Sequence, residues 1–285
     1  MELKRNAFGY LEVLPKPSKD ELAAYYNAKY FNNDAADNPY SASYSDEEIL
    51  HKEIDAAECA YFARAEHKRL LDIGCGEGFV MSAFSKRGFS VRGLDFTTDG
   101  VRHFFPELVD EVAVGDLYEL IEEEVASQRQ YDVVTCNNVL EHVRDPERMA
   151  SLMRGLLAPG GIARLQVPND DTYMNRDIVR RGLAAEEFFK ATPDHLSYFN
   201  FDTFQALARR SGFNVDAVLG SFPIGFFLYN TDCNYRLDRS KGKKCHYARV
   251  AIDGMLYRES LEKLVGFRQG CGAVGLGNDV TLYCS

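Results

Sequence analysis

Three glycines at alternate positions follow a short apolar run in residues 69–79, which read Arg-Leu-Leu-Asp-Ile-Gly-Cys-Gly-Glu-Gly-Phe. The apolar run predicts a buried strand, and the residues from Phe79 onward predict an amphipathic helix. A strand that turns through glycines into a helix exposes backbone N–H groups and lets a ligand approach the main chain. The spacing differs from dinucleotide-binding turns and phosphate loops. Because Asp72 would repel an anion but attract an ammonium group, we expect a ligand with a cationic end.

The segment 71–78 resembles motif I of class I S-adenosylmethionine-dependent methyltransferases. This resemblance implies that Asp72, Gly74, Cys75 and Gly76 hold the amino-acid end of S-adenosylmethionine, whose product is S-adenosylhomocysteine. On the motif alone, an ordinary glycine-rich turn in another α/β fold stays an alternative.

Asp95 ends a second predicted strand, 90–95, about twenty residues beyond the glycines. A βαβ unit places a carboxylate there to accept hydrogen bonds from ribose hydroxyls. The alternative is an N-cap for a helix from Thr97. Phe96 would pack on the adenine ring, and the resemblance implies that Asp116 accepts from the adenine amino group while the Leu117 backbone pairs with a ring nitrogen.

Residues 131–143 resemble the fourth-strand motif of the same family, in which the strand ends beside the transferred methyl group. The resemblance implies cofactor contacts from Asn137, Leu140 and His142. The sequence Leu-Glu-His at 140–142, followed by Arg-Asp-Pro at 144–146, is similar to the branch that includes ubiquinone-type and sugar methyltransferases.

An alcohol or ammonium acceptor needs a base to remove its proton. His195, with Asp194 beside it and Tyr198 one turn away, is the first candidate, and His142 is the second. Alternatively, His195 caps a turn and braces its loop. We expect Asn169, His195 and Tyr198 to contact the acceptor. The cysteines lack zinc-finger spacing, so we expect no metal and no disulfide framework.

Strands alternate with helices through short crossovers, which predicts an α/β, doubly wound, mostly parallel seven-stranded sheet with ligands at the carboxyl ends of the strands. Predicted strands are 69–73, 90–95, 111–114, 131–137, 162–167, 213–219 and the antiparallel 279–284; predicted helices are 46–66, 79–87, 117–127, 147–157, 202–211 (capped by Asp202) and one near 246–267.

The core is expected at 67–219 and 279–285, and insertions at 171–200 and 220–278 are expected to form a substrate cap. Residues 1–20 read as irregular, apart from a capping box at Ser18. The resemblance implies that 1–66 is a helical lid region in which Tyr30 contacts the cofactor; the alternative is that the aromatic stripe after Ser18 packs in the core.

The chain of 285 residues carries a formal net charge of -10, which disfavours a nucleic-acid partner. It shows no signal-peptide run and no segment long enough to span a bilayer, so we expect a cytoplasmic monomer or homodimer.

The expected reaction is methyl transfer to an O or N atom of a small polar acceptor, such as a sugar, a nucleotide-sugar or a surface-polysaccharide precursor. The residues Pro-Asn at 168–169 and the segment 194–199 favour this acceptor, whereas the aromatic run 222–229 favours a quinone, acyl or polyketide-type acceptor. An RNA or protein methyltransferase and a cofactor-binding module without turnover are further alternatives.

Overall fold

A seven-stranded sheet forms the centre of the computed structural model, which describes residues 1–18, 21–22, 25, 44–63 and 67–285. The strand order is β5-β4-β3-β6-β7-β10-β9, and β10 alone runs antiparallel to its neighbours β7 and β9. The strands are β3 (Arg69–Ile73), β4 (Ser90–Asp95), β5 (Val112–Val114), β6 (Tyr131–Asn137), β7 (Leu157–Pro168), β9 (Val215–Gly220) and β10 (Asp279–Cys284). The predicted fold class is confirmed, and the bounds of β3, β4, β6 and β10 match the predicted ranges.

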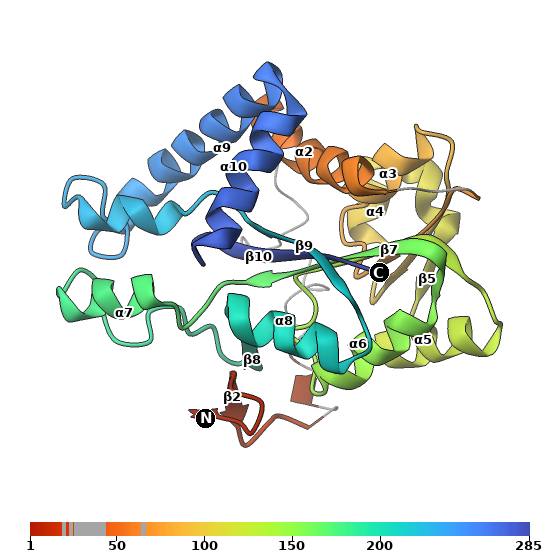
Figure 1. Cartoon of the computed structure of the whole chain (residues 1–285), viewed down its shortest axis with the longest axis horizontal. Helices are drawn as coiled ribbons and strands as arrows, with labels where there is room; N and C mark the ends of the chain where they lie inside the picture. Colours follow the sequence, from red (N-terminus) through yellow and green to blue (C-terminus); the bar gives the residue numbers. More distant parts are fainter. Residues whose placement is uncertain (19–20, 23–24, 26–43, 64–66) are drawn as a thin grey trace.

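Helices cover both faces of this sheet (Figure 1). One layer holds α2 (Asp46–Phe62), α3 (Phe79–Ser85), α4 (Asp99–Phe104), η2 (Pro106–Glu111), α9 (Gly242–Glu259) and α10 (Leu261–Ala273). The other layer holds α5 (Leu117–Ala126), α6 (Pro146–Gly155) and α8 (Phe201–Arg210). Two hydrophobic cores result, one on each face of the sheet, because a parallel strand must bury both of its faces.

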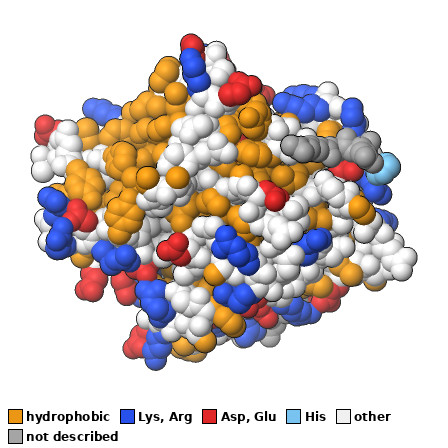
Figure 2. Space-filling view, in the orientation of Figure 1, with side chains coloured by type: hydrophobic (Ala, Val, Ile, Leu, Met, Phe, Trp, Pro, Cys, Tyr) orange, Lys and Arg blue, Asp and Glu red, His pale blue; other side chains and the backbone are white. Residues whose placement is uncertain are grey.

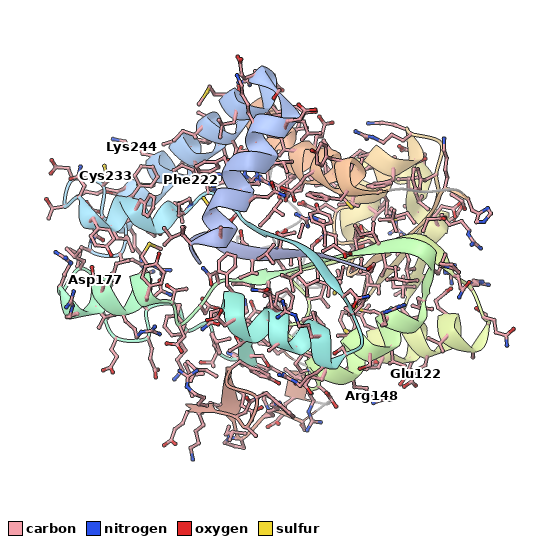
Figure 3. All side chains as sticks on the ribbon, viewed as in Figure 1. Glu122, Arg148, Asp177, Phe222, Cys233 and Lys244 are labelled. Carbon is pink, nitrogen blue, oxygen red and sulfur yellow. The ribbon has the colours of Figure 1, made fainter. Side chains whose placement is uncertain are left out.

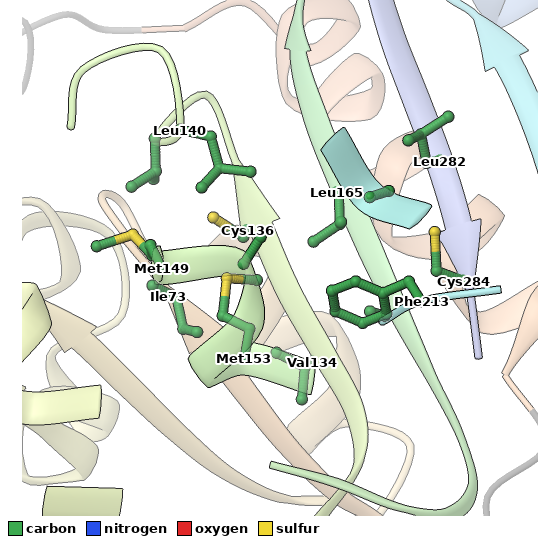
Figure 4. Packing of buried hydrophobic residues seen from close by; sticks show 14 of the residues in the cluster. Ile73, Val134, Cys136, Leu140, Met149, Met153, Leu165, Phe213, Leu282 and Cys284 are labelled. Carbon is green, nitrogen blue, oxygen red and sulfur yellow. The ribbon is translucent and has the colours of Figure 1, made fainter. Parts of the chain in front are cut away.

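The larger core packs the helices α5, α6 and α8 against the middle of the sheet. Figure 4 shows Met149 and Met153 of α6 beside Ile73 and Val134, with Leu165 on the next strand. All five side chains have no exposed area. This packing fixes the carboxyl ends of β3 and β6 next to each other, where the predicted ligand site lies.

The N-terminal residues form a hairpin that the sequence did not predict. Strands β1 (Glu2–Arg5) and β2 (Leu11–Leu14) pair with each other, and β2 pairs with β8 (Ser197–Tyr198). Tyr10 packs on Phe199, with ring centroids 4.7 Å apart. The prediction of an irregular segment was wrong because these short strands depend on a partner far away in the sequence.

Only parts of the predicted lid region are described. The capping box is confirmed: Ser18 Oγ accepts from the Glu21 backbone at 3.2 Å, and Glu21 Oε2 accepts from the Ser18 backbone at 2.8 Å. Tyr30 lies outside the described residues. The lid and the cap stay predictions.

The two insertions contain α7 (Tyr173–Arg180), η3 (Ile224–Tyr229) and η4 (Arg239–Lys241) besides α9 and α10. The single helix predicted near 246–267 is two helices, because Ser260 is extended and its Oγ caps α10 by accepting from the Lys263 backbone. The predicted cap of α8 was also wrong: Asn200 caps that helix, in a capping box with Thr203. Tyr229 Oη donates to Asp177 Oδ2 at 3.0 Å, which ties η3 to the outer end of α7 (Figure 3).

Within the described part of the chain, every helix is too short or too polar to cross a bilayer. Hydrophobic side chains gather on the face that α9 and α10 present in Figure 2.

Candidate active site

The glycine turn after β3 has left-handed backbone geometry at Gly74, Gly76 and Gly78, with φ of +69°, +53° and +80°. At Gly74 the turn also meets the loop that follows β6. A Cβ placed on Gly74 would lie 2.4 Å from Val139 Cγ2, which is closer than any real Cβ contact. Only glycine therefore lets the turn after β3 and the loop after β6 approach each other this closely.

Substituting Gly74 by alanine is expected to lower the free energy of unfolding by roughly 1–3 kcal/mol and to weaken cofactor binding, because Val139 must move and the backbone is strained. Chemical unfolding and calorimetric titration with S-adenosylmethionine measure the two effects. Gly88→Ala is the matched control: Gly88 has a φ of +80° but nothing within 4 Å of the added Cβ. Equal losses in both variants would contradict the steric argument.

Asp95, the last residue of the neighbouring strand β4, binds the glycine turn through its carboxylate. Its Oδ2 accepts from the Gly76 N–H at 2.8 Å, and its Oδ1 accepts from the Thr97 N–H at 3.3 Å. The carboxyl is 7% exposed, and burial raises its pKa. Asp95 does not cap α4, whose N-cap is Thr98. The carboxylate is thus held at the turn, next to the place where the resemblance puts the ribose.

Asp72 lies one residue before the end of β3 and is 3% exposed. Thr135 Oγ1 of β6 donates to Asp72 Oδ1 at 2.6 Å. Burial raises the pKa of Asp72 from 3.8 to about 6, against the hydrogen bond from Thr135, and the charge of Asp95 raises it further. A buried carboxylate of this kind gains from a nearby cation, such as the ammonium group of S-adenosylmethionine.

Cofactor affinity is expected to fall as the pH falls through about 6, because protonated Asp72 no longer attracts the ammonium group. At pH 5 about one tenth of the carboxyl is ionised, so the Kd rises about tenfold relative to pH 7.5. The raised pKa has the opposite sign for folding: the folded state holds this proton more tightly than the unfolded chain, so the stability from this group falls as the pH rises from about 4 to about 6 and is constant above that. Calorimetric titration over pH 5–8 measures the affinity. An Asp72→Asn variant that keeps the same pH dependence would contradict the assignment.

Asp116 and Leu117 stand where β5 turns into α5. Asp116 is the N-cap of α5, and its Oδ1 accepts from the backbone of Tyr118 at 2.9 Å. The Leu117 side chain is buried, so the predicted ring contact would use its backbone. Phe96, directly after β4, is 44% exposed. These adenine contacts stay predictions.

At the end of β6, Asn137 is half-buried and its Oδ1 accepts from Arg164. Leu140 and Cys75, both predicted to contact the cofactor, are buried in the two cores. Contacts from either residue would therefore run through the backbone.

His142 and His195 lie together, which the sequence alone did not establish. Their rings meet edge to face with centroids 4.8 Å apart. His142 Nδ1 is 2.8 Å from the carbonyl oxygen of Asp194. Because a carbonyl only accepts, Nδ1 of the neutral ring carries the proton and Nε2 carries the lone pair. The backbone carbonyl of Glu141 accepts from Leu196 at 2.7 Å, which holds the 171–200 segment against the loop after β6.

Glu141 joins the two histidines in a cluster that could hold a metal ion, since one ligand atom from each residue lies within 4.8 Å of the others. Glu141 is 1% exposed, and burial raises its pKa well above the ordinary value. The sequence did not reveal this cluster because His195 comes from a different segment. The expectation that no metal is needed stays a prediction.

Asn169 and Tyr198, predicted to contact the acceptor, each donate a side-chain hydrogen bond to a backbone carbonyl. Asn169 Nδ2 donates to the Gly277 carbonyl at 3.0 Å, and Tyr198 Oη donates to the His195 carbonyl at 3.2 Å. Asn169 also lines a cleft of about 590 Å³ between α7, α8 and α10, whose lining includes neither histidine. Acceptor contacts from these two residues are proposals.

The strand order, with an antiparallel β10 between β7 and β9, and the acidic residues at the carboxyl ends of the parallel strands define the class of S-adenosylmethionine-dependent methyltransferases. The chain belongs to the family described as "Methyltransferase domain", whose sequence pattern matches residues 47–218. Its cofactor is S-adenosylmethionine.

Two relatives and one solved structure illustrate the similarity. A ubiquinone biosynthesis O-methyltransferase of Burkholderia ambifaria is 30% identical over 185 residues, which cover 61% of this chain and 79% of the relative. A protein of the same name from Aeromonas salmonicida is 38% identical over 96 residues, which cover 33% of this chain and 40% of that one. The crystal structure of a SAM-dependent methyltransferase from Archaeoglobus fulgidus superposes with a TM-score of 0.50 at 16% identity, covering 86% of this chain and 95% of that one.

Proposed function

We propose that this methyltransferase transfers the methyl group to a hydroxyl oxygen of a small aromatic, quinone-type acceptor. The observation that carries the proposal is the similarity to proteins named ubiquinone biosynthesis O-methyltransferase. The sugar acceptor that the sequence favoured has no specific support from these relatives, which favour the alternative.

Aromatic side chains near the two histidines are consistent with a flat acceptor. Tyr198 lies 6.0 Å from His195 and 5.9 Å from Phe189, measured between ring centroids. Tyr198 is 1% exposed and so supports the neighbouring rings, whereas Phe189 is half-buried and can meet the face or edge of another aromatic ring. The aromatic run 222–229 supports the proposed acceptor only indirectly. Its Leu228, in η3, packs in a small core with Met174 and Ile178 of α7, and α7 belongs to the 171–200 segment that also carries His195.

Methyl transfer from a sulfonium is an in-line displacement, so the protein must hold the acceptor oxygen, the methyl carbon and the sulfur in line. We assign Asp72 to the ammonium group, Asp95 to the ribose and Asp116 to the adenine. These three residues stand at successive strand ends of one sheet and so fix the cofactor along its length.

His142 accepts the proton of the acceptor hydroxyl at Nε2, because its Nδ1–H is held by the Asp194 carbonyl. Bound S-adenosylmethionine would supply the methyl group: the acceptor oxygen would displace its sulfur, the electron pair of the C–S bond would stay on sulfur to give the neutral thioether S-adenosylhomocysteine, and the hydroxyl proton would end on His142. The imidazolium of His142 would then return this proton to solvent.

The purified chain, with methyl-labelled S-adenosylmethionine, is tested on three acceptor groups: catechols with a long apolar substituent, the same compounds with the hydroxyls already methylated, and nucleotide sugars. We expect label only in the free catechols. Transfer to the nucleotide sugars alone would overturn the proposed acceptor. Cofactor binding without turnover on any of the three would favour a binding module.

A further inference from the structure

Arg164 of β7 is a buried guanidinium, 2% exposed, at the centre of the sheet. Its Nη1 donates to Asn137 Oδ1 at the end of β6, and its Nε donates to Tyr283 Oη at 3.1 Å. A buried charge of this kind is costly unless it is paired.

The balancing charges come from α2. Glu58 Oε1 lies 3.6 Å from Arg164 Nη2 and accepts from Tyr283 Oη at 2.8 Å. Glu58 Oε2 accepts from Arg268 of α10 at 2.7 Å. Glu58, Tyr283 and Arg268 are all buried, so the guanidinium of Arg164 is held by Glu58 and Tyr283 as well as by Asn137. Arg164 cannot turn away without its buried charge losing these partners.

The contact with Asn137 has a chemical consequence, because arginine has only donors. The amide of Asn137 must present its oxygen to Arg164, and this sets which way the amide faces. Its NH₂ group then points away from Arg164. Cys136 of β6 pairs with Ile73 of β3, so Asn137 lies level with the start of the glycine turn, and its neighbour on the same face of β6, Thr135, donates to Asp72.

We propose that Arg164 is a positioning residue that fixes the Asn137 amide so that its NH₂ group donates to the carboxylate of the methionine portion of S-adenosylmethionine. Asp72 attracts the ammonium group of that portion, and Asn137 binds its other end. The inference rests on the proposed place of the cofactor at the strand ends, but not on the identity of the acceptor. It can therefore be tested by binding, with no acceptor present.

The decisive variant is Asn137→Asp. Aspartate keeps an oxygen for Arg164 but removes the donor, so we expect the Kd of S-adenosylmethionine to rise at least about tenfold, with the melting temperature unchanged or higher. Decarboxylated S-adenosylmethionine, which lacks the carboxylate, should bind the variant no worse than it binds the wild type. Wild-type affinity of Asn137→Asp for S-adenosylmethionine would overturn the proposal.

Two further variants separate positioning from stability. Arg164 reaches Tyr283 and Asn137 from two different nitrogens, whereas the donors of a lysine all lie on one nitrogen. In Arg164→Lys the contact with Asn137 is therefore weakened, so the Kd of S-adenosylmethionine should rise, and adding Asn137→Asp should cause a smaller further rise than Asn137→Asp causes in the wild type. Tyr283→Phe keeps the Arg164–Asn137 contact and should lower the melting temperature without changing the Kd. If Arg164→Lys lowers only the melting temperature, Arg164 is structural and the proposal fails. Absence of turnover on catechols, by contrast, would affect only the proposed acceptor.

Discussion

Replacing His142 by alanine is expected to lower kcat about 10²- to 10⁴-fold while leaving the Kd of S-adenosylmethionine within a few-fold of the wild type. The reason is the fixed tautomer: the Asp194 carbonyl, 2.8 Å from Nδ1, holds the Nδ1 proton and so puts the lone pair on Nε2. Steady-state kinetics at saturating catechol, together with calorimetric titration of the cofactor, measures both quantities. The side chain of His142 is 22% exposed, so its loss should cost little stability.

His195→Ala is the matched variant, because its ring packs edge to face on His142. We expect His195→Ala to lower kcat less than His142→Ala does, with the Kd of S-adenosylmethionine similar in both variants. The opposite order, with the larger loss of kcat in His195→Ala, would show that His195 is the base, as the sequence alone suggested.

Replacing Asp95 by alanine is expected to raise the Kd of S-adenosylmethionine about 100-fold. The variant loses the charged acceptor proposed for the ribose hydroxyls. It also releases the Gly76 N–H, which Oδ2 holds at 2.8 Å, and so loosens the glycine turn. Calorimetric titration measures the affinity, and the melting temperature measures the stability lost when the turn is loosened.

Asp95→Asn separates these two effects because its amide keeps one oxygen for Gly76 but carries no charge. A 2′-deoxy analogue of S-adenosylhomocysteine should bind the wild type more weakly than the parent compound does, and Asp95→Asn should reduce that difference. An unchanged difference in the variant would mean that Asp95 only supports the turn.

Local sequence patterns determined most of the sheet. The apolar run 70–73 and the glycines after it gave the bounds of β3, and the final strand at 279–284 was predicted as an antiparallel partner. The carboxyl ends of parallel strands meet at one edge, so placing the strands also placed Asp72, Asp95 and Asp116 together. The family and its cofactor follow from these same segments.

Tertiary structure decided the features whose partners lie far apart along the chain. The hairpin β1–β2 forms on β8, and no local period signals such a pairing. His142 and His195 meet because Leu196 donates to the Glu141 carbonyl, a contact between two loops. Arg164 is a charged residue in a mostly apolar strand, and only the packing of α2 and β10 shows that Glu58 balances its charge and that Tyr283 accepts from its Nε. Periodicity along a sequence reports which face of an element is buried, whereas the identity of the group it is buried against depends on the whole fold.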